Sequence, residues 1–201
     1  MVLPNMGYGT HGGRTGDPGQ RRSDRKRAGM GETVRRYEKG DHVSYMNSGV
    51  CLVDDICPQE GLGGGLFYLL RPLAHPKATI FIPVDNEQLV SRMDPVPDRE
   101  EIDRMIGEAK SSRIEWIPDR KARVEMFRPI LRECGTVDLL RLSDCIYRQK
   151  DTLADQGKKL SATDEGILTQ AERMIENLFG YALQVEGEQV RSFLNTALRG
   201  A

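Results

Sequence analysis

The chain has 201 residues and a mass of 22.6 kDa, enough for one medium-sized domain or two small ones. Hydrophobic residues make up 38% and charged residues 29%, which is a globular balance. No apolar run approaches the roughly 20 residues that cross a bilayer, and no signal-peptide pattern opens the chain, so the composition predicts a cytoplasmic protein rather than a membrane protein.

The formal net charge of −1 is unevenly distributed along the chain. Residues 1–36 hold eight Arg or Lys and three Asp or Glu, which leaves 21 basic and 27 acidic residues in the remainder. A protein that bound nucleic acid mainly by neutralising phosphates would be basic. Any contact with nucleic acid must therefore be local and assisted by a protein partner.

Residues 1–35 contain eight glycines, two prolines and a basic cluster at 21–27, without a periodic apolar pattern. Such a segment cannot bury enough apolar surface to offset the entropy lost on ordering. We therefore expect a disordered Gly/Arg-rich tail. The segment can also be explained as an over-long gene start, with Met30 as the initiator, or as a nucleic-acid-binding tail.

Four short apolar runs, rich in Val, Ile, Phe and Tyr, follow the tail and are separated by Gly, Asp, Asn and Pro. This is the pattern of strands joined by turns. Residues 61–65 include four glycines and predict a flexible hairpin loop. The runs predict a small, strongly bent antiparallel sheet or barrel over residues 36–92. They cover residues 37–45, 48–56, 66–70 and 78–84.

From Asp98 onward the apolar residues recur at spacings of three and four, which predicts helices. The apolar stripes are typical of a bundle core. The fold class expected is therefore α+β multidomain, with a small β-barrel followed by an all-α bundle over residues 93–201. The predicted helices begin at Asp98, Pro118, Thr136, Ser161 and Glu188.

Caps and breakers refine these predicted helices. Thr136 is the expected N-cap of the third helix and Gly157 its end, while Ser161 and Asp164 offer a capping box for the fourth. Pro129 should bend or split the second helix, because its ring blocks the hydrogen bond to the preceding turn.

Trp116 is the only tryptophan and stands just before the predicted helix start at Pro118. Cations at the start of a helix oppose its dipole, an arrangement that favours an anion such as phosphate at that end. A large flat side chain beside arginines can act as a wedge against a base step. Alternatively, Trp116 packs between two helices with arginines lying over it. The flanking cations are Arg113, Arg120, Lys121 and Arg123.

Catalysis and metal binding find little support in the sequence. The glycine loop has no Gly-Lys-Ser/Thr ending, and the acid pairs at 54–55 and 100–101 are typical of solvated surface. We therefore expect a protein that is not an enzyme and holds no cofactor or metal. The cysteines and histidines lack the close spacing of a zinc site or of a Cys-His pair. They are Cys51, Cys57, Cys134, Cys145, His11, His42 and His75.

The barrel segments carry a family resemblance. They read Gly-Asp-x-Val-x-Tyr at 40–45, Gly-Val-Cys-x-Val-x-Asp-Ile at 49–56 and Ile-x-Ile-Pro-Val-Asp-Asn at 80–86. These motifs resemble the amino-terminal module of the CarD/CdnL family of bacterial transcription regulators, which is related to a module of the transcription-repair coupling factor. The resemblance implies a Tudor-like barrel that docks on the β-subunit lobe of RNA polymerase.

The helical segment resembles the same family. Residues 115–123, 157–161 and 171–175 follow its pattern, so the resemblance covers about residues 36–185 in the family's order. It implies a non-enzymatic regulator that is associated with the nucleoid through polymerase. Trp116 would lie in the minor groove of promoter DNA at the upstream edge of the bubble and stabilise the open complex. The alternative is an adaptor that binds only protein, with Trp116 in its core.

The resemblance also implies site residues. Two positions depart from the family's pattern: Phe81 stands where some members have a basic residue that contacts polymerase, and Pro118 where some have one after the Trp. The expected DNA contacts are Trp116, Arg113, Arg120, Lys121, Arg123, Lys158 and Lys159. The expected polymerase contacts are Ile56, Cys57, Thr79, Ile80, Phe81 and Ile82. No membrane or small-molecule partner is expected.

Overall fold

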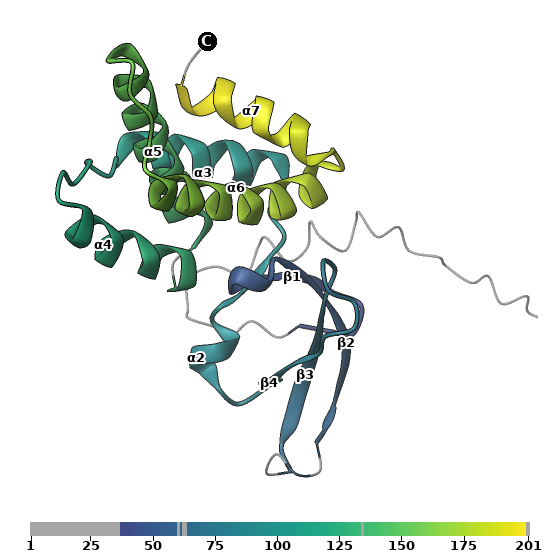
Figure 1. The fold of residues 1–201 in the computed structure, drawn as a ribbon. Coiled ribbons are helices and arrows are strands. Elements are labelled where there is room, and N and C mark those ends of the chain that lie inside the picture. The colour runs from purple at the N-terminus through teal and green to yellow at the C-terminus, as the bar shows by residue number, and fades with distance from the viewer. Residues whose placement is uncertain (1–36, 60, 62–63, 134, 200–201) are drawn as a thin grey trace, which may run out of the picture. The chain divides into compact units, whose positions relative to one another are not determined.

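The computed structural model describes residues 37–59, 61, 64–133 and 135–199. The predicted disordered tail, residues 1–35, lies outside this range. Five strands form the first part of the described chain and helices dominate the rest, which confirms the predicted fold class (Figure 1).

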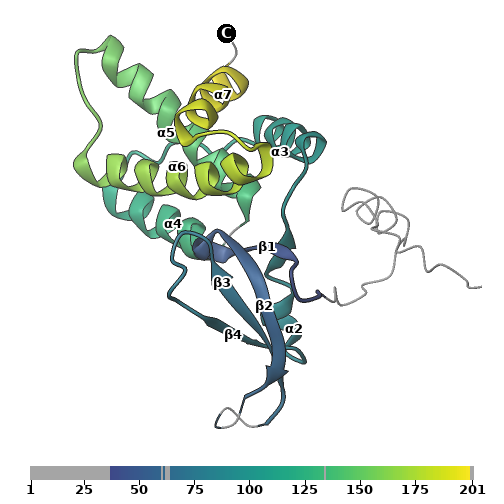
Figure 2. The ribbon, with the colours of Figure 1, turned by 90° about the vertical axis from the view of Figure 1, so that its right-hand side faces the viewer.

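The strands form one antiparallel sheet in the order β4-β3-β2-β1-β5 (Figure 2). A single helical turn, α2, lies between β4 and β5 in sequence and contributes Leu89 and Val90 to the sheet's core. The sheet continues to Pro95, past residue 92, because β5 pairs with β1. The bounds are β1 His42–Tyr45, β2 Val50–Pro58, β3 Leu66–Pro72, β4 Ile80–Pro83, α2 Glu87–Val90 and β5 Met93–Pro95.

Alternation along the strands divides the sheet into an inner and an outer face. The inner face holds a compact apolar cluster. The cluster consists of Tyr37, Val43, Tyr45, Cys51, Val53, Tyr68, Leu70, Ile82, Val90 and Met93.

Strand β2 contains a bulge. Its register with β3 shifts between Val53 and Asp55, so β2 has one extra residue there. Such bulges increase the local twist.

Five helices follow where the periodicity predicted them. The Asp98 carboxylate accepts from the Glu101 N–H at 2.9 Å and closes a capping box at the start of the first. Ser161 caps the fourth as predicted, accepting from the Asp164 N–H. The helices are α3 Arg99–Ser111, α4 Arg120–Glu133, α5 Thr136–Asp155, α6 Ala162–Leu183 and α7 Gly187–Arg199.

Two details differ from the sequence expectation. Thr136 is not the N-cap of α5 but its first residue. The N-cap is Gly135, which has an extended backbone and no side chain to accept a capping hydrogen bond. Pro129 does not split α4, which runs without interruption from Arg120 to Glu133. Gly157 does end α5: its φ of +66° and the bond from the Lys158 N–H to the Leu153 carbonyl, at 2.8 Å, form a Schellman turn.

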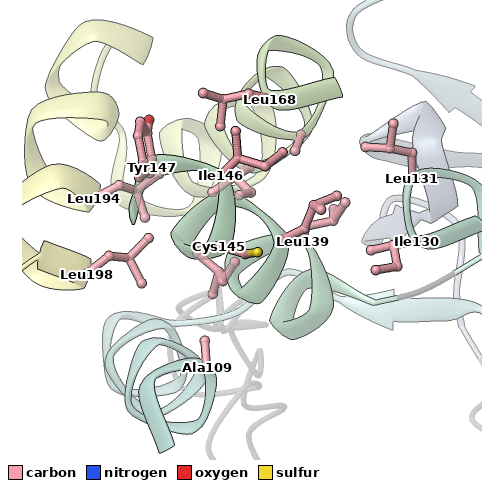
Figure 3. Close-up of a cluster of buried hydrophobic side chains, with 14 of the residues drawn as sticks. Ala109, Ile130, Leu131, Leu139, Cys145, Ile146, Tyr147, Leu168, Leu194 and Leu198 are labelled. Atoms are coloured by element: carbon pink, nitrogen blue, oxygen red, sulfur yellow. The ribbon is translucent and has the colours of Figure 1, made fainter. Parts of the chain in front are cut away.

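The helices bury a second apolar cluster, drawn in Figure 3, to which each of α3 to α7 contributes. Cys145 belongs to it as a small apolar residue, and burial raises the pKa of its thiol to about 11. Val50, at the start of β2, also packs into this cluster. Gly49 precedes it at a φ of +70°, with the Asn177 side chain 3.7 Å from where a Cβ would lie. Sheet and helices therefore share part of one core.

Candidate functional site

Among the residues that the structure describes, strand β4 is at the end of the sheet order and pairs only with β3. The Val84 N–H donates to the Leu66 carbonyl at 2.9 Å, on the β3 side. In an antiparallel pair, alternate residues direct their main-chain groups to the partner, so Ile80 and Ile82 also face β3. The N–H and C=O of Phe81 consequently point away from β3, whereas the carbonyl of Pro83 accepts a hydrogen bond from the Asn86 N–H at 3.1 Å.

The structure divides the six expected polymerase contacts between the two faces of the sheet. Ile82 is 2% exposed and belongs to the inner cluster, against which Ile56 and Ile80 are packed. Phe81 is 40% exposed, Thr79 is exposed and Cys57 is half-buried. Strand alternation turns the three isoleucine side chains toward the inner face, where Ile82 is buried and Ile56 and Ile80 are partly buried.

Sequence reasoning missed two outer-face residues beside Phe81. Leu69 pairs directly with Phe81, and Phe67 pairs with Pro83 on one side and Cys57 on the other. Since 67, 69 and 81 share one face, they form a continuous apolar strip across β3 and β4. Alternate residues of a strand lie on the same face, so pairing Phe81 with Leu69 and counting two residues along β3 to Phe67 could have identified them.

Trp116 lies in the segment between α3 and α4 and is half-buried against the helical cluster. The rings of Trp116 and Phe127 meet edge to face, with centroids 6.2 Å apart and an interplanar angle of 65°. The guanidinium carbon of Arg123 is 4.1 Å from the centroid of the indole, within cation–π range. The indole is thus held by two residues of α4 and is only partly accessible.

Arg123 is a structural residue and not a free DNA contact, which corrects the sequence expectation. Its side chain is 5% exposed, and Nε and Nη2 each donate to one carboxylate oxygen of Asp164, both at 2.9 Å. Its Nη1 donates to the carbonyls of Ile117 at 2.6 Å and Pro118 at 3.1 Å. Arg123 lies one turn before Phe127 on the buried face of α4, and all three of its guanidinium nitrogens already donate within the chain.

Asp164 is the centre of this polar network. It is 1% exposed, and the Ser161 hydroxyl donates to its Oδ2 at 2.6 Å. Burial alone would raise the pKa of this carboxyl, but the hydrogen bonds from Arg123 and Ser161 and the guanidinium charge outweigh burial and lower the pKa. The pair therefore fastens the first turn of α4 to the first turn of α6 in its ionised form.

The remaining expected DNA contacts are exposed cations. Arg113 is 3.5 Å from the buried Asp144 carboxylate, and Arg120 donates to the Thr163 hydroxyl at 2.8 Å. Lys121 is exposed and has no ion-pair partner among the residues that the structure describes. Lys158 and Lys159 are exposed in the α5–α6 connection, which ends at Ser161. The network around Asp164 therefore brings this connection toward the start of α4.

The sequence reasoning also missed Arg128 and Arg132 of α4. Both are exposed, and within the described chain neither forms an ion pair. They follow Lys121 at spacings of seven and eleven, which places all three on one helical face, together with Glu125. The heptad spacing of these cations was visible in the sequence.

Within residues 37–199, as far as they are described, no group of three or more His, Cys, Asp or Glu side chains is placed to hold a metal ion. None of the described helices combines the length and apolar composition that a bilayer crossing requires. Cys134 and His11 lie outside the described residues. Asp54 and Asp55 are partly exposed and pair with Arg71 and Lys39.

We predict that Asp164→Asn lowers the free energy of unfolding by about 3 kcal/mol at pH 7, because it leaves the Arg123 charge buried without a counter-charge. A folded-state pKa below the unfolded value of about 3.9 means that the ionised pair stabilises the fold above that pH. This stability is lost as the pH falls through the folded-state pKa. The difference between variant and wild type should therefore shrink at pH 3, as urea unfolding followed by circular dichroism will show.

The matched control is Asp103→Asn, which removes the carboxylate of the exposed Arg99–Asp103 pair at 3.2 Å. Exposed pairs of this kind contribute less than about 0.5 kcal/mol. A loss at Asp164 no larger than the loss at Asp103 would contradict the structural role of the pair.

The residues of the sheet match a known protein family. The family model described as the CarD-like/TRCF RID domain matches residues 37–94. A search of the curated proteins finds no match. The matched range begins at Tyr37 of the inner cluster and ends within β5, so it covers the sheet and not the helices that follow. This chain therefore carries a CarD-like/TRCF RID domain, as the motifs of its strands indicated.

Proposed function

We propose that this protein is a non-enzymatic transcription regulator that docks on the β-subunit lobe of RNA polymerase and contacts promoter DNA beside Trp116. The observation that carries the proposal is the RID domain at residues 37–94, since domains of this family are RNA polymerase-interacting modules. The open edge of β4 supplies a physical means of docking. An extended partner strand can add to it through main-chain hydrogen bonds.

The helical part supplies the DNA contact in this proposal. Trp116 stands beside exposed cations at the start of α4, where the Asp119 carboxylate already accepts from the Ala122 N–H at 2.8 Å, so the attraction for phosphate in this proposal comes from the cations. Arg123 acts indirectly: it stacks on the indole and holds it through Asp164. A half-buried, oriented indole loses less conformational entropy on insertion at a base step than a mobile one would.

Bivalency explains how a protein whose charge beyond residue 36 is acidic can act on DNA. Docking on polymerase raises the local concentration of the Trp116 surface at the promoter, so its own affinity for DNA can be weak. Contacts that form only with the opened duplex shift the equilibrium from the closed to the open complex. The sign of regulation then depends on which promoter step is slow.

A second candidate is an adaptor that binds only protein. The observation in its favour is the half-burial of Trp116 against the helical cluster and Phe127. Because Trp116 is the only tryptophan, iodide quenching of intrinsic fluorescence distinguishes the two functions. Protection of Trp116 on adding promoter DNA in excess, which contributes no tryptophan fluorescence, supports the regulator, and unchanged quenching supports the adaptor.

Trp116→Ala should shorten the lifetime of the open promoter complex by about tenfold, the effect of losing one stacking contact of ~1.4 kcal/mol. Capture of polymerase by the variant should be unaltered. The control is Met126→Ala, which truncates an exposed apolar residue of α4. Equal lifetimes for Trp116→Ala and wild type, with both folded by circular dichroism, would exclude the wedge.

Lys121→Glu should weaken retention of promoter DNA by the polymerase complex and reduce the slope of log K against log salt by about one. The reason is the loss of one phosphate contact. Arg104→Glu, on the exposed face of α3, makes the same change of net charge away from Trp116. If the two variants change the slope equally, the DNA surface is not at the start of α4.

A further inference from the structure

The segment that carries Trp116 has little support from its own main chain. It connects α3, which ends at Ser111, to α4, which begins at Arg120. In the described part of the chain, the main chain of residues 113–118 forms no hydrogen bond with another main-chain group. Main-chain carbonyls that pack against a protein interior need donors. The conformation of this segment therefore depends on side chains that donate to it.

Arginine side chains supply these donors on both sides of Trp116. After the indole, Arg123 of α4 donates to two successive carbonyls. Before the indole, Nη2 of Arg148 donates to the Ile114 carbonyl at 2.7 Å. Because Arg148 belongs to α5, the segment is fastened to two different helices.

A buried carboxylate orients Arg148. Asp144 lies one turn earlier on α5 and is 2% exposed, and its Oδ2 accepts from Nε of Arg148 at 3.1 Å. A guanidinium presents its N–H groups in a fixed fork, so placing Nε on the carboxylate also directs the remaining nitrogens. Nη2 then faces Ile114. A carboxylate and an arginine thus hold the start of the segment, as a second such pair holds its end.

The two pairs differ in exposure, which makes the second one accessible to mutation. The Arg148 side chain is 35% exposed, whereas Arg123 is buried. If Arg148 is replaced, Arg113 still lies beside Asp144, with its Nε 3.5 Å from Oδ2. The buried carboxylate consequently keeps a counter-charge, which limits the cost of the substitution to folding.

We infer that Arg148 is a positioning residue for Trp116, and that Asp144 holds Arg148 in the orientation that this requires. Fastening the main chain on both sides of the indole limits the motion of the side chain. The consequence for DNA rests on the proposed function: an indole that is oriented before it meets the duplex loses less conformational entropy there.

The first test uses the free protein, in which Trp116 is the only tryptophan. Arg148→Lys keeps the positive charge beside Asp144, but one nitrogen cannot occupy the positions of both Nε and Nη2. We expect the fast component of the fluorescence anisotropy decay, which reports motion of the indole within nanoseconds, to at least about double in amplitude. Arg148→Met, which removes every donor, should give at least the same increase.

The matched control is Arg141→Lys, the same substitution on the same helix. Arg141 donates to Asp138 and Glu108, which lie outside the segment that carries Trp116. Its anisotropy decay should equal that of wild type. Circular dichroism and thermal melting of each variant separate faster motion of the indole from loss of the fold.

The second test determines whether Arg148 acts through Trp116. Arg148→Lys should shorten the lifetime of the open promoter complex by about threefold, the effect of losing one weak hydrogen bond. In the Trp116→Ala background the same substitution should have no further effect, because two residues that act through one contact are not additive.

Three results would overturn the inference: an unchanged anisotropy decay in Arg148→Lys, an equal increase in Arg141→Lys, or an equal shortening of the lifetime with and without Trp116. Failure of the proposed function gives a different result. In that case the indole moves faster in Arg148→Lys, which supports the positioning role, while Arg148→Lys and Trp116→Ala both keep the wild-type lifetime.

Discussion

The bidentate pair between Arg123 and Asp164 is the interaction on which the helical half of the molecule depends. Burying two charges is costly unless their hydrogen-bonding capacity is satisfied. Here the guanidinium donates hydrogen bonds to the carboxylate and to two carbonyls of the α3–α4 connection, and the Ser161 hydroxyl also donates to the carboxylate. One network thus joins α4 to α6, fixes the segment that carries Trp116, and presents a cationic face to the indole.

The sheet is governed by a different constraint, the alternation of side chains across β4. Its inward residues complete the core of the sheet, which leaves Phe81 as the one large β4 side chain directed outward. The two halves therefore offer surfaces of different chemistry: an apolar strand edge on the RID domain and a cation-rich helix start beside Trp116. Under the proposed function, salt should weaken the contact of the second surface with DNA.

Strands, helices and most caps could be predicted from the sequence, because alternation, apolar spacing and residues such as Asp98 and Ser161 encode local structure. β5 could not be predicted, because its three residues have no alternating apolar pattern and form a strand only by pairing with β1. Among the site residues, Arg123 was misassigned because burial of a charge depends on a partner 41 positions away. Ile56, Ile80 and Ile82 were grouped with Phe81 because motif matching ignores which face each residue occupies.

The most direct test of the central claim is capture of bacterial RNA polymerase, and separately of its isolated β-lobe fragment, by the immobilised full-length chain. The account predicts that both are retained, because the RID domain alone supplies the docking contact and the lobe alone receives it. Retention of neither by a chain that melts cooperatively would contradict the account, and the protein-only adaptor would take its place.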